Sequence, residues 1–224
     1  LIANILAITL YLAGACYQGN YLLRKSATPP KRELLLSIGA SAVTAHAISV
    51  LGSIYSGNPI DLGFFKVSSL IFWFITTLTL LSTLRRPLDS LLVGLFPLAA
   101  LSIVVSSLSS NSQEINPTLT PGMLSHILTS ILAYSVLTIA AIQATALAIQ
   151  EHQLKSHHTH GIIQSLPPLQ TMEQMLFEVI WIGVTLLTVS IVTGALFIDD
   201  IFAQHLVHKT SLSITAWTIF ATLL

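Results

Sequence analysis

The sequence predicts an all-α membrane protein, a polytopic bundle of transmembrane helices. Hydrophobic residues make up 53% of the 224 residues and charged residues only 8%, whereas a soluble domain carries about 25% charged residues. The mean hydropathy is +0.81. Apolar runs of roughly 20 residues, the length that crosses a bilayer, recur along the chain between short polar segments. These observations place the protein in a lipid bilayer.

Seven apolar runs are separated by segments rich in proline, glycine and charge, such as "TPPK", "SGNPIDLG", "RRPLD" and "SLPPLQT". The predicted spans are Leu1–Leu23, Glu33–Ile54, Lys66–Leu84, Asp89–Leu108, Leu124–Ile149, Met175–Ile198 and a seventh that begins at Ser211. The seventh run is cut off within "WTIFATLL", so we expect an eighth span in the full protein. No soluble domain fits between the spans, and residues 1–224 are expected to form a single transmembrane domain.

The distribution of positive charge predicts the orientation. Seven of the nine Lys and Arg residues fall in the loops after the first, third and fifth spans: Arg24, Lys25, Lys31, Arg32, Arg85, Arg86 and Lys155. The loops after the even-numbered spans hold only Lys66 and Lys209. Because cytoplasmic loops are enriched in Lys and Arg, the N-terminus is expected outside the cytoplasm.

Several functional classes are disfavoured. The net charge is zero and no basic cluster exceeds two residues, so a nucleic-acid partner is not expected. Cys16 is the single cysteine, and a C-x-x-C-H site for covalent haem is missing. Nucleophile-elbow, Walker and HExxH motifs are absent as well. We therefore expect a protein that is not an enzyme.

His126 begins a polar stripe on the fifth predicted span. His126, Ser130, Tyr134 and Thr138 recur every four residues and share one helix face. Lipid would penalise that face, so it is expected to turn toward the bundle interior, near the outer surface. Ionisable groups within spans are functional candidates; the alternative is a histidine that bonds a neighbouring helix as a packing contact.

His46 lies beside a seam of small residues on the second span, formed by Ser37, Ser41, Ala45, Ser49 and Ser53. Such a seam lets another helix approach closely. A ligand histidine and a structural histidine bonded to a hydroxyl or carbonyl are both compatible with this position.

The outer segment "LFIDDIFAQHLVHKTS" is predicted to be a short amphipathic helix on the membrane surface. His205 and His208 would project from about the same side of it; the alternative is two solvated histidines. Together with His126 they would place imidazoles at the outer surface, where a pair could bind haem iron, copper or zinc.

The sequence contains two further candidate functional features. His152, His157, His158 and His160 form a His-rich cytoplasmic tract that could bind metal or remain a solvated loop. Glu178 lies about one turn into the sixth span and is either interfacial or an intramembrane carboxylate with a partner helix.

Three stretches carry a family resemblance: "TPGMLSHILTSILAYSVLTIAAIQATALA", "LPPLQTMEQMLFEVIWIGVTLLTVSIVTGALF" and "HKTSLSITAWTIF". They resemble the cytochrome c assembly protein family, in particular its YpjD/HemX-like branch of inner-membrane proteins, related to the CcsA and CcmC haem-handling proteins. The resemblance implies a multi-pass protein of the bacterial inner (cytoplasmic) membrane. Such a protein would bind or pass haem b and work with other cytochrome c maturation proteins.

The resemblance also implies site residues. A histidine that opens a span lines the family's external haem site and corresponds to His126, while an earlier transmembrane histidine corresponds to His46. The iron ligands are then expected to be His126 with His208 or His205, and His46 would be a deeper cofactor ligand.

The sequence departs from the family pattern in the outer loop. Family haem handlers carry a tryptophan-rich WWD motif where this chain has "FIDDIFAQHLVHKT". A second transmembrane histidine near the start of the sixth span is replaced, with Glu178 in that neighbourhood. Two other functions follow as alternatives: a cofactor-free scaffold or transporter accessory subunit that retains the fold, and a small-solute or cation transporter.

Overall fold

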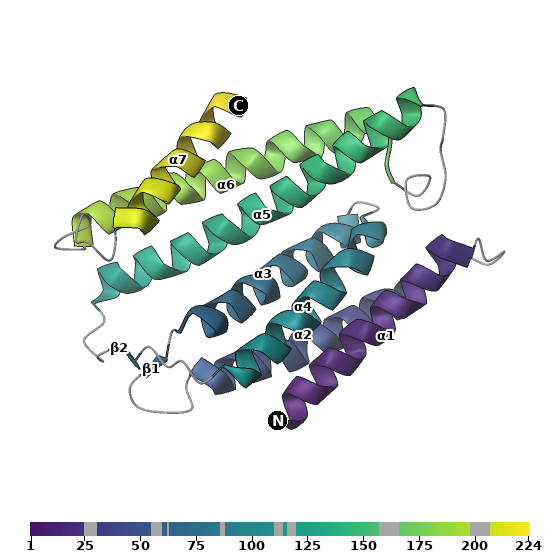
Figure 1. Ribbon diagram of the computed structural model, residues 1–224, viewed down its shortest axis with the longest axis horizontal. Coiled ribbons are helices and arrows are strands. Elements are labelled where there is room, and N and C mark those ends of the chain that lie inside the picture. The colour runs from purple at the N-terminus through teal and green to yellow at the C-terminus, as the bar shows by residue number, and fades with distance from the viewer. Residues whose placement is uncertain are drawn as a thin grey trace. The chain divides into compact units, whose positions relative to one another are not determined.

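The computed structural model describes residues 1–24, 31–54, 60–61, 63–85, 88–109, 114–115, 120–156, 166–197 and 207–224. These residues form seven α-helices (Figure 1): α1 (Ile2–Arg24), α2 (Arg32–Ile54), α3 (Phe64–Arg85), α4 (Leu92–Leu108), α5 (Pro121–Lys155), α6 (Leu169–Phe197) and α7 (Val207–Leu223). A 3₁₀ turn, η1 (Asp89–Leu91), precedes α4. The two-residue strands β1 (Ile60–Asp61) and β2 (Glu114–Ile115) are the only other regular elements in the described ranges.

Six of these helices, α1 to α6, are long and apolar enough to cross a membrane. The predicted all-helical membrane fold is therefore confirmed for the described residues, apart from the short strand pair. The seventh predicted span corresponds to α7, which begins at Val207, four residues before the predicted start, and has 17 residues.

The chain forms two compact units. Unit 1 comprises Leu1–Pro117 and Ala148–Leu169, and unit 2 comprises Thr118–Leu147 and Gln170–Leu224. In unit 1, α1 packs against α2 and α4, and α3 packs against the same two helices. The core of this bundle contains Tyr11, Leu35, Leu92, Phe96 and Ile103, all almost fully buried.

Polar contacts join the connecting segments at both ends of the unit 1 bundle. The connections α2–α3 and α4–α5 meet in an antiparallel pair, with Ile60 opposite Ile115 and Asp61 opposite Glu114. Where α2 begins, the Arg32 guanidinium lies 3.4 Å from the carboxylate of Asp89 in η1. It also donates to the carbonyl of Thr83 near the end of α3.

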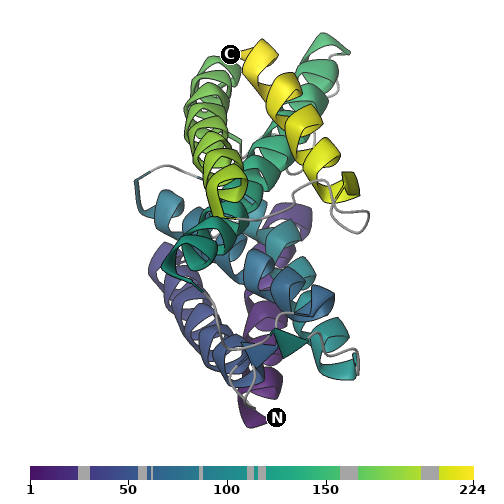
Figure 2. The ribbon, with the colours of Figure 1, turned by 90° about the vertical axis from the view of Figure 1, so that its left-hand side faces the viewer.

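In unit 2, α7 lies against α5 and α6 in both views (Figures 1 and 2). Ala133 and Leu137 of α5 pack with Leu187 of α6, and Ala216 and Phe220 of α7 contact this cluster. α5 has 35 residues and α6 has 29, so they are about 52 and 44 Å long. Both exceed the roughly 30 Å of hydrocarbon in a bilayer.

Candidate functional site

The imidazole of His126 packs against α6. His126 lies in the second turn of α5, where its side chain is half-buried. Its Nδ1 atom lies 2.8 Å from the carbonyl oxygen of Ser190 in α6, a residue only 4% exposed. Among the described residues no hydrogen-bond partner is found for Nε2. The ring is thus fixed at one nitrogen.

Three of the four residues of the polar stripe on α5 contact neighbouring helices of unit 2, so the predicted inward orientation is confirmed in part. The Ser130 hydroxyl lies 2.6 Å from the Ser190 hydroxyl and 2.6 Å from the His126 carbonyl oxygen. One turn farther along, the Tyr134 hydroxyl lies 2.5 Å from Ser213 Oγ in α7. Thr138, the last member of the stripe, donates to the Tyr134 carbonyl of its own helix.

A glycine on α6 provides the space for the His126 ring. A Cβ atom at Gly194 would lie 2.8 Å from His126 Cε1, closer than real Cβ contacts, and 3.0 Å from Nδ1, which is tight. The imidazole edge that bears Nδ1 therefore lies directly on the α6 backbone. The Nε2 atom is farther from that position, at 3.7 Å.

His208 lies at the same end of unit 2 as His126. It occupies the first turn of α7 and its side chain is exposed. α5 and α7 run in the same direction (Figures 1 and 2) and are joined by the Tyr134–Ser213 bond. Counting from that bond at 1.5 Å per residue, His126 lies about 12 Å and His208 about 7.5 Å toward the N-terminal ends of their helices.

The predicted amphipathic surface helix is only partly described. His205 and residues 198–206 lie outside the described residues. The described part, with His208 and Lys209, is the first turn of α7 and continues into that helix.

His46 occupies a different environment, inside unit 1. Its side chain is fully buried. Nδ1 lies 3.1 Å from the Tyr11 hydroxyl of α1 and Nε2 lies 3.0 Å from Ser69 Oγ of α3. Both ring nitrogens are occupied, so His46 would have to release one hydroxyl before it could bind a metal.

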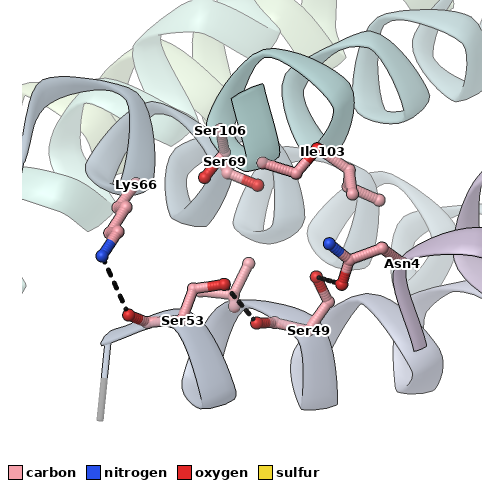
Figure 3. A pocket seen from close by; sticks show the side chains of 9 residues that line it. Asn4, Ser49, Ser53, Lys66, Ser69, Ile103 and Ser106 are labelled. Atoms are coloured by element: carbon pink, nitrogen blue, oxygen red, sulfur yellow. Dashed lines mark hydrogen bonds between the residues drawn. The ribbon is translucent and has the colours of Figure 1, made fainter. Parts of the chain in front are cut away.

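A small polar pocket adjoins the His46 network (Figure 3). Residues from α1 to α4 line it, among them Asn4, Ser49, Ser53, Lys66, Ser69 and Ser106. Ser49 donates to Asn4 Oδ1 at 2.8 Å and Lys66 donates to the Ser53 carbonyl at 3.1 Å. The cavity volume is about 10 Å³, which is enough for about one water molecule. The pocket is therefore too small for an organic ligand.

The remaining predicted residues do not form a metal cluster in the described ranges. No group of three or more His, Cys, Asp or Glu side chains comes together there. Of the His-rich tract, His152 is exposed near the end of α5, and His157, His158 and His160 lie outside the described residues. Glu178 is exposed on α6.

Ser190 and Gly194 were not identified from the sequence as site residues. A signal was available, because Gly183, Ser190 and Gly194 recur at intervals of seven and four along α6 and so share one face. Small residues on one face of a membrane helix mark a close helix contact. The contact occurs with α5, where a Cβ atom at Gly183 would lie 2.4 Å from Leu137 Cδ2.

Comparison with known proteins gives a consistent assignment. The family model described as "Cytochrome C assembly protein" matches residues 34–224. The chain is 31% identical to the inner membrane protein YpjD of Escherichia coli K12 over 197 residues, which covers 86% of this chain and 74% of YpjD. An uncharacterised 28.8 kDa protein of Azospirillum brasilense is 30% identical over 101 residues, or 44% of this chain and 37% of that protein. No solved structure matches. The chain therefore belongs to the cytochrome c assembly protein family.

Proposed function

We propose that this protein binds and handles haem b in the bacterial inner (cytoplasmic) membrane, in support of cytochrome c assembly. Membership of the cytochrome c assembly protein family supports a role in cytochrome c assembly. The similarity to a protein named as an inner membrane protein supports the location, and six apolar helices support a multi-pass arrangement. The proposed role is binding and transfer, without catalysis.

The observation that carries the proposal is the setting of His126. One nitrogen of the imidazole is held by a backbone carbonyl, and the second nitrogen has no partner among the described residues. Metal-binding histidines commonly have this arrangement, in which the second ring N–H is donated to a carbonyl or carboxylate. The donor set therefore fits one axial position of a haem iron. When bound, haem supplies the redox-active iron.

The other candidate ligands fit less completely. His208 is exposed at the same end of unit 2 as His126 and is the preferred second axial ligand, with His205 as the alternative. His46 would be a deeper ligand, but both of its nitrogens are engaged by hydroxyls. The N-terminus is proposed to lie outside the cytoplasm, which places His126 and His208 toward the outer face.

A second candidate function is a cofactor-free membrane scaffold or transporter accessory subunit that retains the fold. Two observations favour it. The segment "FIDDIFAQHLVHKT" contains no tryptophan, whereas the haem-handling members that the chain resembles carry the tryptophan-rich WWD motif at this place. The buried His46 of unit 1 has both ring nitrogens bonded by hydroxyls of the protein itself.

The absorbance spectrum of the purified protein separates these functions. The protein would be expressed with haem supplied and purified in mild detergent. We expect a Soret band at about one haem per chain. A folded but colourless protein under the same conditions would exclude haem handling and leave the scaffold function.

A further inference from the structure

The hydrogen atoms of the His126 cluster can be assigned from the chemistry of its acceptors. A carbonyl oxygen only accepts, so His126 Nδ1 carries a hydrogen and donates it to Ser190 across 2.8 Å. Likewise the Ser130 hydroxyl donates its only hydrogen to the His126 carbonyl across 2.6 Å. The 2.6 Å contact between the two serine hydroxyls must then use the hydrogen of Ser190.

The three hydrogen bonds form a closed ring between α5 and α6. His126 donates to the backbone of Ser190, Ser190 donates through its hydroxyl to Ser130, and Ser130 donates to the backbone of His126. Each donor is used once. A neutral imidazole has one N–H, so with Nδ1 protonated the lone pair must lie on Nε2.

Gly194 makes this ring possible. The Cε1–Nδ1 edge of His126 occupies the space where a side chain at position 194 would begin. Any side chain there would push the imidazole away from α6 and lengthen its bond to Ser190, one turn earlier. Glycine at this position is therefore required by the approach of the ring.

We propose that Gly194 is a positioning residue which, together with the backbone carbonyl of residue Ser190, holds His126 as its Nδ1–H tautomer and presents Nε2 as the ligating atom. The tautomer follows from the contacts within unit 2 alone. The identity of the ligated group, a haem iron, rests on the proposed function. A fixed tautomer means that no ring rotation or proton transfer is needed before the metal binds.

The first test uses the protein without haem. Nitrogen NMR of ¹⁵N-histidine-labelled protein distinguishes protonated from unprotonated ring nitrogens, and His126→Ala identifies the resonances. We expect the neutral ring to carry its hydrogen on Nδ1, where it is hydrogen-bonded, and none on Nε2. A His126 ring with the hydrogen on Nε2 would overturn the proposal.

The second test uses matched alanine variants. Gly194→Ala should release the Nδ1 bond and give a mixture of tautomers, whereas Ser190→Ala keeps the carbonyl and should keep the tautomer. Gly94→Ala is the control, because a Cβ atom there would meet nothing within 4 Å. If Gly194→Ala folds and leaves the tautomer and its hydrogen bond unchanged, the positioning role is wrong. If Gly194→Ala does not fold, the wild-type protein alone tests the proposal, and a hydrogen on Nε2 of His126 overturns it.

Haem titration then separates the two proposals. With both correct, Gly194→Ala lowers haem affinity about 10- to 100-fold, the usual loss when the outer partner of a metal ligand is disturbed, while Gly94→Ala leaves it unchanged. If the wild-type tautomer is Nδ1–H but no haem binds, the proposed function fails and the positioning role stands. If haem binds with equal affinity in wild type and Gly194→Ala, the positioning role fails alone.

Discussion

Tyr11 and His46 form an edge-to-face pair in the core of unit 1, with the tyrosine hydroxyl 3.1 Å from Nδ1 of the imidazole. The ring centroids are 5.7 Å apart and the planes are nearly perpendicular, at 86°. Ser69 closes the other side of the imidazole at 3.0 Å. This chain of three side chains joins α1, α2 and α3 within a bundle whose other buried contacts are mostly apolar.

We expect His46 to contribute mainly to stability. His46→Ala leaves a cavity and two buried hydroxyls without their partner, which should lower the free energy of unfolding by about 2–4 kcal/mol. Tyr11→Phe keeps the ring but leaves the buried Nδ1 of His46 without its hydroxyl partner, so it should cost about 1–3 kcal/mol and create no comparable cavity. Thermal unfolding in detergent checks both values.

The same variants test the prediction of a deeper haem ligand. If His46 is structural, the haem bound per folded molecule is unchanged in His46→Ala. A marked loss of haem with normal unfolding would instead make His46 a ligand and contradict the structural assignment.

Alanine substitutions at two glycines should change the stability of the protein in opposite directions. At Gly183 a Cβ atom would lie 2.4 Å from Leu137 Cδ2, and Leu137 is buried, so Gly183→Ala should destabilise by about 1–3 kcal/mol. Gly94 is exposed with open space around it. Gly94→Ala should stabilise by up to about 1 kcal/mol, because alanine is the better helix former. Equal effects on the unfolding temperature would refute this view of the α5–α6 contact.

The proposed orientation can be tested by cysteine labelling. In a background in which Cys16 is replaced by serine, Ser112→Cys should react with an impermeant maleimide added to whole cells, and Ser156→Cys should react only after lysis. These positions follow the fourth and fifth predicted spans. The reverse pattern would place the N-terminus in the cytoplasm.

His208 should be dispensable for folding. Its side chain is exposed in the first turn of α7, and surface substitutions usually change stability by less than about 0.5 kcal/mol. As second axial ligand, however, its loss should shift the haem spectrum from two imidazoles to one. His208→Ala and His205→Ala, measured separately, show which histidine is used. An unchanged spectrum in the double variant would exclude both.

Sequence patterns predicted the helices well and their ends less well. The third predicted span, Lys66–Leu84, differs from α3 (Phe64–Arg85) by two residues at one end and one at the other. The fifth, Leu124–Ile149, underestimates α5 (Pro121–Lys155) by nine residues in total. Hydropathy ends at the first polar residues, but a helix continues while its backbone is hydrogen-bonded, as it does through Glu151 and Lys155. That pair even forms an i,i+4 ion pair of 2.6 Å.

For the site residues, the sequence predicted which helix face is buried but not which residues it contacts. The period of four on α5 predicted that His126 and Ser130 face a neighbouring helix, and both contact Ser190 of α6. The partners themselves depend on how helices pair and in which register, which local patterns do not specify. For that reason Tyr11 and Ser69, 35 and 23 residues from His46 in the chain, could not be named as its partners, although a bond to a hydroxyl was one of the two alternatives considered for His46.

The helix lengths also bear on Glu178. About 20 residues span the hydrocarbon core, and α6 extends for 29 residues to Phe197. Counting back from Phe197 places Glu178 near the opposite boundary, beside the exposed Trp181. Tryptophan is enriched at that level of the bilayer, so the interfacial interpretation of Glu178 is favoured over an intramembrane carboxylate.

The haem content of His126→Ala tests the central claim most directly. Wild type, His126→Ala and the control Gly94→Ala would be expressed with haem, purified alike and measured for Soret absorbance per folded chain. Alanine preserves the helix, so the account predicts a normally folded His126→Ala protein that has lost most of its haem. A wild-type protein with bound haem whose amount and spectrum are unchanged in His126→Ala would contradict the claim that His126 is an axial ligand.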